Sequence, residues 1–248
     1  AEARSASAVK QRFVANMSHE LRTPIHGILS FARFGKTRAL EASRDELLDF
    51  FVTIERSGTE LLDLVDGLLD LAELDSGKAP LELRAADLGD LVCAVVAETR
   101  FLAVEKGIDL ELHPLPDDLV TRFDALQIRR VLRRLLANAI QYSPPGADPI
   151  ELRVEREADL IQVTVRDHGI GIPPEELDSI FDRFAQSSLT RDESGGTGLG
   201  LAISRDVVLR HGGWLWAENA ERGSLFAFTL PLDQPTTAAD AGPARTSA

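Results

Sequence analysis

The sequence predicts an α+β protein of two domains, in which a hairpin of two long helices precedes a domain of alternating strands and helices. Two observations predict the hairpin: apolar residues recur at helical spacing in residues 13–35, and again from 45 to about 76. A third predicts the second domain, because short strand-like and helical patterns alternate after Gly-Lys-Ala-Pro at 77–80. The expected boundaries are 1–76 for the hairpin, 77–80 for a linker, 81–232 for the second domain and 233–248 for a disordered tail or linker.

The first predicted helix has one apolar seam, formed by Met17, Leu21, Pro24, Ile28 and Phe31. Because each helical residue advances by about 100°, His19 lies roughly 200° from Met17, and its imidazole is predicted to point away from the buried face. Pro24 removes a backbone donor, so we expect the helix to bend or loosen just after His19. A neutral imidazole is a competent nucleophile when a carboxylate takes its proton, and Glu20 is placed for that role.

The second predicted helix follows a short connection at 35–44, and Ser43 or Asp45 can cap it. Its seam alternates steps of four and three, as in a coiled coil, and consists of Leu47, Phe51, Ile54, Gly58, Leu61, Val65, Leu68 and Ala72. Further leucines widen the apolar face beyond what one partner helix covers, at Leu48, Leu62 and Leu69. We therefore expect a homodimer through residues 1–76 that closes a four-helix bundle. The alternative is packing of this face against the second domain of the same chain.

The second domain is predicted to contain seven strands and three helices. Strands are expected at 81–83, 108–112, 120–124, 150–157, 160–167, 214–218 and 224–230, the last two as a hairpin. Helices are expected at 87–106, 125–142 and 202–211, the first of them capped by Asp87. Cys93 lies in the apolar run LVCAVVA and is predicted to be a buried packing residue, and a single cysteine fits a reducing compartment.

Composition restricts the partners and the location that we expect. The net charge is −13, from 40 acidic and 27 basic residues, and no basic patch stands out. Nucleic-acid surfaces need clustered Lys and Arg, so no nucleic-acid partner is expected. No apolar run approaches the roughly 20 residues of a membrane span, and we expect a cytoplasmic chain whose only route to the inner membrane is a missing upstream segment.

Two patches of the second domain contain the first candidate site residues. Asn138 interrupts the apolar periodicity of RRLLANAIQYSP, at a cost in helix propensity. Asp167 ends a strand and is followed by Gly169 and Gly171, so the backbone can approach a planar ligand while the carboxylate accepts from an exocyclic amine. Neither a Rossmann fingerprint nor a P-loop is present.

Two more patches suit phosphates. The segment Phe-Asp-Arg-Phe at 181–184 contains Arg183, which can reach an anion. The glycine-rich GGTGLGL at 195–201 leads into a helix, where free amides and the helix dipole favour a phosphate. The polar stretch between these patches has no strong structural signal and is predicted to form a mobile lid.

The hexapeptide from His19 to Pro24 resembles the phosphoacceptor box of sensor histidine kinases. The four patches, in this order, resemble the N, G1, F and G2 boxes of the GHKL-type ATPase domain of the same family, and the combined resemblance spans about residues 10–231. It implies an α/β sandwich with helices on one face of a mixed sheet. It also implies that His19 accepts phosphate from ATP, that Glu20 is the general base, and that Thr23 places water when the regulator is dephosphorylated.

The resemblance further implies ATP and Mg²⁺ as cofactors, with Asn138 as the metal ligand, and the receiver domain of a response regulator as partner. Asp167 would hold the adenine amino group, the G1 glycines would line the base pocket, and the G2 glycines would hinge the lid. The ATP-binding residues implied are Asn138, Gln141, Tyr142, Asp167, Gly169, Gly171, Arg183, Gly196, Thr197, Gly198, Leu199 and Gly200.

This sequence departs from the family pattern at two positions. The family often has a second Asn at the position of Arg134 and a phosphate-binding Lys at the position of Gln141. Loss of that Lys predicts weaker ATP binding, which Arg134 would offset from one heptad earlier on a similar helix face. A weakened or phosphatase-dominant enzyme is therefore an alternative to an active kinase.

Other interpretations remain open from sequence. His26 shares the face of His19 but lacks the Glu-x-x-Thr setting, which makes it the weaker acceptor candidate. A GHKL conformational ATPase or chaperone would explain the four patches but not the exposed histidine, and a dimerisation scaffold would need a decayed nucleotide site. Covalent phosphate on the protein separates these interpretations. The composition of 233–248 suits a linker, such as one leading to a receiver domain.

Overall fold

The computed structural model describes residues 2–76, 81–190 and 198–232. The chain divides into two compact units, one formed by 1–79 with 180–203 and the other by 80–179 with 204–248. Each unit is described separately. Within the described residues, no helix is both long and apolar enough to cross a bilayer.

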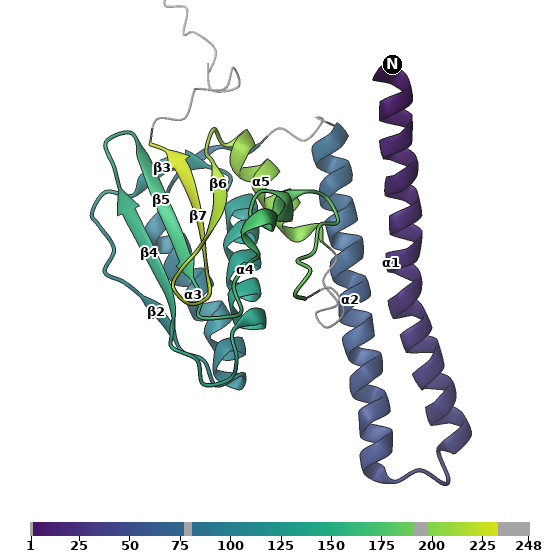
Figure 1. Ribbon diagram of the computed structural model, residues 1–248. Helices are drawn as coiled ribbons and strands as arrows, with labels where there is room; N and C mark the ends of the chain where they lie inside the picture. The colour runs from purple at the N-terminus through teal and green to yellow at the C-terminus, as the bar shows by residue number, and fades with distance from the viewer. Residues whose placement is uncertain (1, 77–80, 191–197, 233–248) are drawn as a thin grey trace, which may run out of the picture. The chain divides into compact units, whose positions relative to one another are not determined.

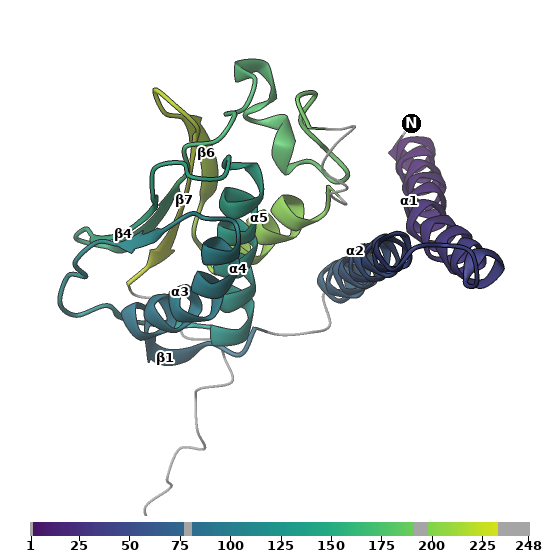
Figure 2. The same ribbon diagram turned by 90° about the horizontal axis from the view of Figure 1, so that it is seen from below.

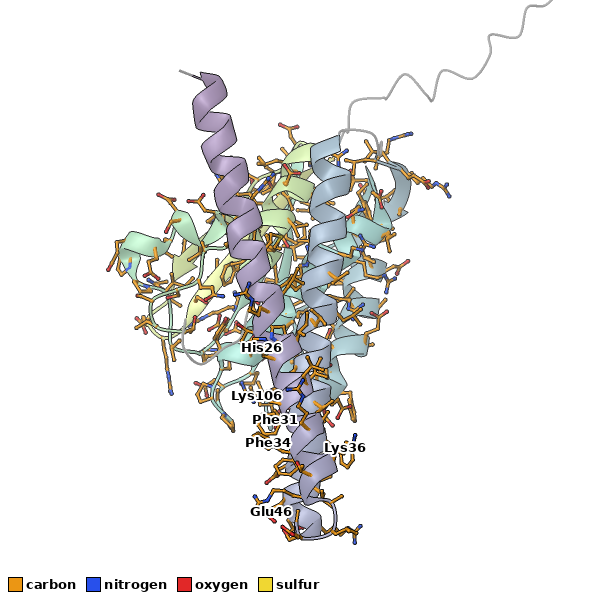
Figure 3. All side chains as sticks on the ribbon, turned by 90° about the vertical axis from the view of Figure 1, so that its right-hand side faces the viewer. His26, Phe31, Phe34, Lys36, Glu46 and Lys106 are labelled. Atoms are coloured by element: carbon orange, nitrogen blue, oxygen red, sulfur yellow. The ribbon has the colours of Figure 1, made fainter. Side chains whose placement is uncertain are left out.

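The helical hairpin consists of α1 (Glu2–Arg38) and α2 (Arg44–Ser76) (Figure 1). Both predicted helices are confirmed, and α1 extends beyond the predicted 13–35 and continues through Pro24. At the end near the connection, Phe31, Phe34 and Phe50 form an aromatic cluster with ring centroids 5.9 to 6.4 Å apart; Figure 3 labels the first two. These rings hold the two helices together at the turn.

Ser43 is the residue that caps α2, of the two candidates considered. Its hydroxyl accepts from the Glu46 N–H at 3.2 Å, while the Glu46 carboxylate accepts from the Ser43 N–H at 2.9 Å. This reciprocal capping box satisfies two amides that the helix leaves without partners. The hydrogen bond from the Ser43 backbone lowers the pKa of Glu46.

The α2 seam differs from the prediction, because the apolar residues of α2 divide between two faces. Ser57 and Leu64 are buried and Phe50 contacts α1, whereas Phe51 of the predicted seam is 66% exposed. The larger apolar side chains left exposed on the described part of the hairpin are Ile25, Leu29, Phe34, Leu40, Leu48, Phe51, Val52, Leu62 and Val65. A helix whose apolar stripe is wider than one partner can cover leaves such a face free within one chain.

The second unit contains a five-stranded mixed sheet with strand order β2-β4-β5-β7-β6. Its strands are β2 (Leu110–Leu112), β4 (Ile150–Arg156), β5 (Leu160–Arg166), β6 (Leu215–Asn219) and β7 (Ser224–Pro231). Only the β2–β4 pair is parallel. A separate antiparallel pair is formed by β1 (Arg84–Asp87) and β3 (Val120–Phe123).

Three helices cover one face of this sheet (Figure 2). They are α3 (Leu88–Glu105), α4 (Ala125–Tyr142) and α5 (Gly200–Arg210). Asp87 caps α3 as predicted, and Asp124 caps α4 in the same way, each carboxylate accepting two backbone amides. Two short 3₁₀ helices, Pro174–Glu176 and Ser179–Phe181, follow β5. The core between the helices and the sheet is aliphatic, with Ile128, Leu132, Leu152 and Ile161 fully buried.

Two predictions for this domain were wrong. The first strand is β1 at Arg84–Asp87 rather than 81–83, because its register with β3 pairs Arg84 with Phe123 and Asp87 with Val120. Cys93 is exposed, not buried. The buried face of α3 runs through Val92, Val95 and Val96, and at about 100° per residue Cys93 lies off that face.

Candidate functional site

Asp167, at the end of β5, is buried and surrounded by three hydrogen-bond donors. Its Oδ1 accepts from the Gly169 N–H at 2.8 Å and from the Ser224 N–H at 3.1 Å, while its Oδ2 accepts from the Ser224 hydroxyl. Asp167 is 3% exposed. Charge-assisted bonds of this kind hold a buried carboxylate in one orientation. The same carboxylate keeps lone pairs free to accept from a planar ligand.

The loop after Asp167 packs closely against the end of α4 and against the turn between β6 and β7. Two glycines allow this close approach. A Cβ at Gly169 would lie 2.5 Å from the carbonyl oxygen of Tyr142 at the end of α4. A Cβ at Gly223, whose φ is +80°, would lie 2.1 Å from the carbonyl oxygen of Asp167. The structure therefore brings together three predicted site residues, Tyr142, Asp167 and Gly169, and adds the turn between β6 and β7 to them.

The other predicted residues of α4 lie near the end of that helix. Asn138 and Tyr142 are half-buried and Gln141 is exposed, next to the buried Ala139 and Ile140. The ammonium of Lys106 donates to the carbonyl oxygens of Ile140 at 2.7 Å and Gln141 at 2.5 Å. A cation on the last carbonyls of a helix satisfies them and complements the helix dipole. Burial lowers the pKa of Lys106.

Near Asp167, the carboxylate of Glu151 on β4 lies close to four basic side chains. Its oxygens lie 2.8 Å from Arg153, 3.2 Å from His113, 3.5 Å from Arg166 and 3.7 Å from His168, the residue after Asp167. The hydrogen bond from Arg153 lowers the pKa of Glu151, and His113 and Arg166 add to this effect. Glu151 therefore stays ionised at neutral pH and fixes the direction of the chain entering the loop.

The segment at 180–203 carries the remaining predicted residues. The Phe184 N–H donates to the Gly198 carbonyl oxygen at 2.8 Å, and a Cβ at Gly198, whose φ is +64°, would lie 2.6 Å from the backbone of Phe184. This contact joins the predicted F and G2 patches. Arg183 is exposed, Leu199 is buried and Gly200 begins α5. Gly196 and Thr197, with the last part of the predicted lid, lie outside the described residues.

The predicted phosphoacceptor residues lie on α1. The backbone of His19 and Glu20 is helical, while their side chains are outside the described part, so the outward orientation of His19 stays a prediction. Thr23 and His26 are exposed on α1, and Figure 3 labels His26.

Three residues that hold the site together were not singled out from the sequence: Lys106, Ser224 and Asn219, the last of which binds Ile172 through two hydrogen bonds. Ser224 follows the turn at Arg222 and Gly223, and nothing in its local pattern indicates that it reaches a residue 57 positions earlier. The pairing of β5 with β7 creates that contact.

Comparisons with known proteins identify the family. Residues 9–77 match the model of the His Kinase A (phospho-acceptor) domain, and residues 123–234 match the histidine kinase-, DNA gyrase B-, and HSP90-like ATPase. The solved catalytic domain of histidine kinase ThkA is 30% identical, with a TM-score of 0.54 over 61% of this chain and 99% of that one. The chain belongs to the histidine kinase family. The predicted family and the two-domain α+β fold are confirmed.

Among curated histidine kinases, MtrB of Mycobacterium leprae (strain TN) is 37% identical over 235 residues, which are 90% of this chain and 40% of MtrB. BarA of Escherichia coli (strain K12) is 36% identical over 243 residues, covering 93% of this chain and 26% of BarA. The chain spans less than half the length of these relatives. These names agree with the predicted enzyme class.

Two further solved structures match most of this chain. ThkA in complex with the response regulator TrrA is 27% identical with a TM-score of 0.73, covering 92% of this chain and 64% of ThkA. Full-length ShkA in complex with AMPPNP is 26% identical with a TM-score of 0.63, covering 91% of this chain and 47% of ShkA. The similarity includes both the hairpin and the ATPase-type domain.

Proposed function

We propose that this chain is the core of a sensor histidine kinase, which uses ATP to phosphorylate His19 and passes the phosphoryl group to an aspartate of a response regulator. The observation that carries the proposal is that one chain joins a phospho-acceptor domain, with His19 on α1, to an ATPase domain with a buried, oriented Asp167. The AMPPNP complex of ShkA and the regulator complex of ThkA support the nucleotide and the partner.

In the proposed reaction, an imidazole nitrogen of His19 attacks the γ-phosphorus of ATP. The bond from that phosphorus to the bridging oxygen breaks, ADP leaves, and Glu20 accepts the imidazole proton. A carboxylate oxygen of the regulator then attacks the phosphorus, the N–P bond breaks, and the imidazole regains a proton. Catalysis consists mainly of positioning: Asp167 holds the adenine, and the amides at the start of α5 meet the phosphates. Thr23 would place water for removal of phosphate from the regulator.

Mg²⁺ fits this arrangement through Asn138. Its amide oxygen is a ligand type that Mg²⁺ accepts, and Mg²⁺ usually takes only one or two protein ligands in addition to substrate phosphates. The described residues contain no group of three His, Cys, Asp or Glu side chains able to hold a metal by themselves. When bound, the ion neutralises charge on the phosphates.

The test is incubation of the chain with radiolabelled ATP and Mg²⁺, followed by acid treatment of the labelled protein. Acid-labile label is expected in the native chain and in the control His26→Ala, because the N–P bond of phosphohistidine hydrolyses in acid. It is expected to be absent from His19→Ala. Label that persists in His19→Ala, or that resists acid, would contradict the proposal. Nucleotide binding without label would favour the phosphatase or scaffold interpretation, with Gln141 as the suspect.

We also propose that the chain forms a homodimer through residues 1–76, since Leu48, Phe51 and Val52 present apolar surface on α2 that no described residue covers. Introducing a charge there should stop association. Phe51→Glu is therefore expected to change the mass measured by light scattering from twice 27.0 kDa to 27.0 kDa. Glu157→Lys, a charge change at an exposed position between β4 and β5 and outside residues 1–76, is the control and should remain dimeric. An unchanged mass for Phe51→Glu would refute this interface.

A further inference from the structure

The loop from Asp167 to Pro173, called the base loop below, is held by two residues of the β6–β7 hairpin. Ser224 binds both carboxylate oxygens of Asp167 at the start of the loop. Asn219 binds Ile172 near its end: Nδ2 donates to the Ile172 carbonyl oxygen at 2.6 Å, and Oδ1 accepts from the Ile172 N–H at 2.9 Å. Asn219 and Ser224 pair with each other across the hairpin. A single cross-strand residue pair of the β6–β7 hairpin therefore holds both ends of the base loop.

The contact of Asn219 with Ile172 imitates the pairing of a neighbouring strand. One carboxamide satisfies both the donor and the acceptor of the Ile172 backbone, which fixes the orientation of that peptide as well as its position. Gly171 has a φ of +73°, and a Cβ there would lie 3.3 Å from Asn219 Oδ1. The carboxamide therefore lies directly against the loop. Between the two anchors, Ile170 is left 56% exposed.

We propose that Asn219 is a positioning residue for nucleotide binding, which holds the base loop in its binding shape before the nucleotide arrives. The inference rests on the proposed function, because it assumes that adenine binds at Asp167 and the base loop. Asn219 acts through Ile172 rather than through the ligand. A loop that is ordered in advance costs less conformational entropy on binding, so affinity is higher than for a loop that the ligand must order.

This role makes a specific prediction about which ligands lose affinity. The base loop carries Asp167, which is assigned to the adenine, whereas the phosphates are assigned to α4 and to the start of α5. Loss of the Asn219 contacts should therefore weaken ATP, ADP and adenosine by the same factor. A defect in the phosphate region would instead spare adenosine.

The experiment compares the native chain with Asn219→Leu, which keeps the size but removes both hydrogen bonds, and with Asn219→Ser, which is too short to reach Ile172. Glu221→Ala is the control, since Glu221 is exposed on the same connection. Binding of the three ligands is measured by calorimetry, and hydrogen exchange is followed in the peptide covering the base loop. The KM for ATP and the kcat are measured by autophosphorylation.

For both Asn219 variants, we expect Kd for all three ligands to rise by roughly threefold to tenfold, the effect of losing two exposed hydrogen bonds. The number of sites per chain should stay the same, the base loop should exchange faster without nucleotide, and KM should rise while kcat changes by less than about twofold. Glu221→Ala should match the native chain.

Native-like Kd values in the Asn219 variants would overturn the inference and leave the proposed function intact. A loss confined to ATP, with adenosine unaffected, would also overturn it, because that pattern locates the defect at the phosphates. If the native chain itself binds no adenine nucleotide, the proposed function fails first, and the role of Asn219 fails with it.

Discussion

Replacing Asp167 by Asn is expected to weaken ATP binding by about tenfold to a hundredfold without unfolding the ATPase-type domain. Asn fits the internal hydrogen bonds: its oxygen can take the place of Oδ1 and accept from Gly169 and Ser224, and its NH₂ can donate to the Ser224 hydroxyl. The group that faces the ligand then changes from an acceptor to a donor. An exocyclic amine placed there loses its partner and meets another donor.

The measurement is a comparison of ATP with ITP, which carries an oxygen where adenine has its amine. The native chain should prefer ATP, and Asp167→Asn should lose or reverse this preference, since its NH₂ can donate to the oxygen of hypoxanthine. Asp178→Asn, an exposed position in the following segment, is the matched control and should keep the native preference. If Asp167→Asn bound ATP as tightly as the native chain, the adenine would have to bind elsewhere.

Local signals were sufficient for most elements of this fold. The apolar period of 3.6 predicted α4 at its observed bounds, Ala125–Tyr142, and a capping carboxylate predicted the start of α3, with Asp87 as its cap. Alternation predicted the β4–β5 pair. These features depend on neighbouring residues, so a single sequence contains the information that determines them.

The predictions were wrong where contacts with segments distant in the sequence determine burial or strand register. Cys93 sits in an apolar run, and only the packing of α3 against the domain determines that it faces solvent. The position of β1 is set by its register with β3, more than thirty residues later. The α2 seam was predicted as one stripe, whereas Phe50 contacts α1 and Phe51, one position on, does not share that face.

In the candidate site, too, residues in local patterns were predicted and residues that depend on long-range contacts were not. Asp167 and Gly169 were predicted because a carboxylate followed by glycines is a local pattern. Ser224 was not, since it reaches Asp167 only through the pairing of β5 with β7. The roles in catalysis of His19, Glu20 and Asn138 are still predictions from the resemblance, which the labelling and nucleotide-binding experiments test.

The unfolding free energy of the ATPase-type domain is expected to fall as the pH drops below about 6.5, the ordinary pKa of histidine, because of His211. This imidazole is fully buried after α5. Its Nδ1 donates to the Val207 carbonyl oxygen at 2.7 Å, and its Nε2 accepts from the Asp124 N–H at 3.0 Å, at the cap of α4. If Nε2 were protonated, its N–H and the Asp124 N–H would face each other, and neither would have an acceptor.

Burial lowers the pKa of His211 in the folded chain; the Asp124 carboxylate and the Val207 hydrogen bond oppose this shift, and Arg210 adds to it. At a pH between the folded and unfolded pKa values, the unfolded chain takes up a proton that the folded chain refuses. Stability from this group is therefore fully present above the unfolded pKa and is lost as the pH falls through and below it. Glu151, whose pKa is also lowered, contributes a loss only at more acidic pH, below the ordinary range of a carboxyl.

The measurement is urea unfolding between pH 5.5 and 8, followed by tryptophan fluorescence, which reports this domain because both tryptophans, Trp214 and Trp216, lie there. His211→Leu should cost about 2 to 4 kcal/mol at pH 7.5, since it leaves the Asp124 N–H buried without its acceptor. The difference in unfolding free energy between the native chain and His211→Leu should become smaller toward pH 5.5, because the buried neutral imidazole stabilises the native chain less at that pH. His26→Leu, an exposed control on α1, should leave the pH profile unchanged. A difference in unfolding free energy that stays constant with pH would contradict this prediction. It would show that His211 has the same pKa in the folded and unfolded chains and that it stabilises the domain by packing and hydrogen bonding alone.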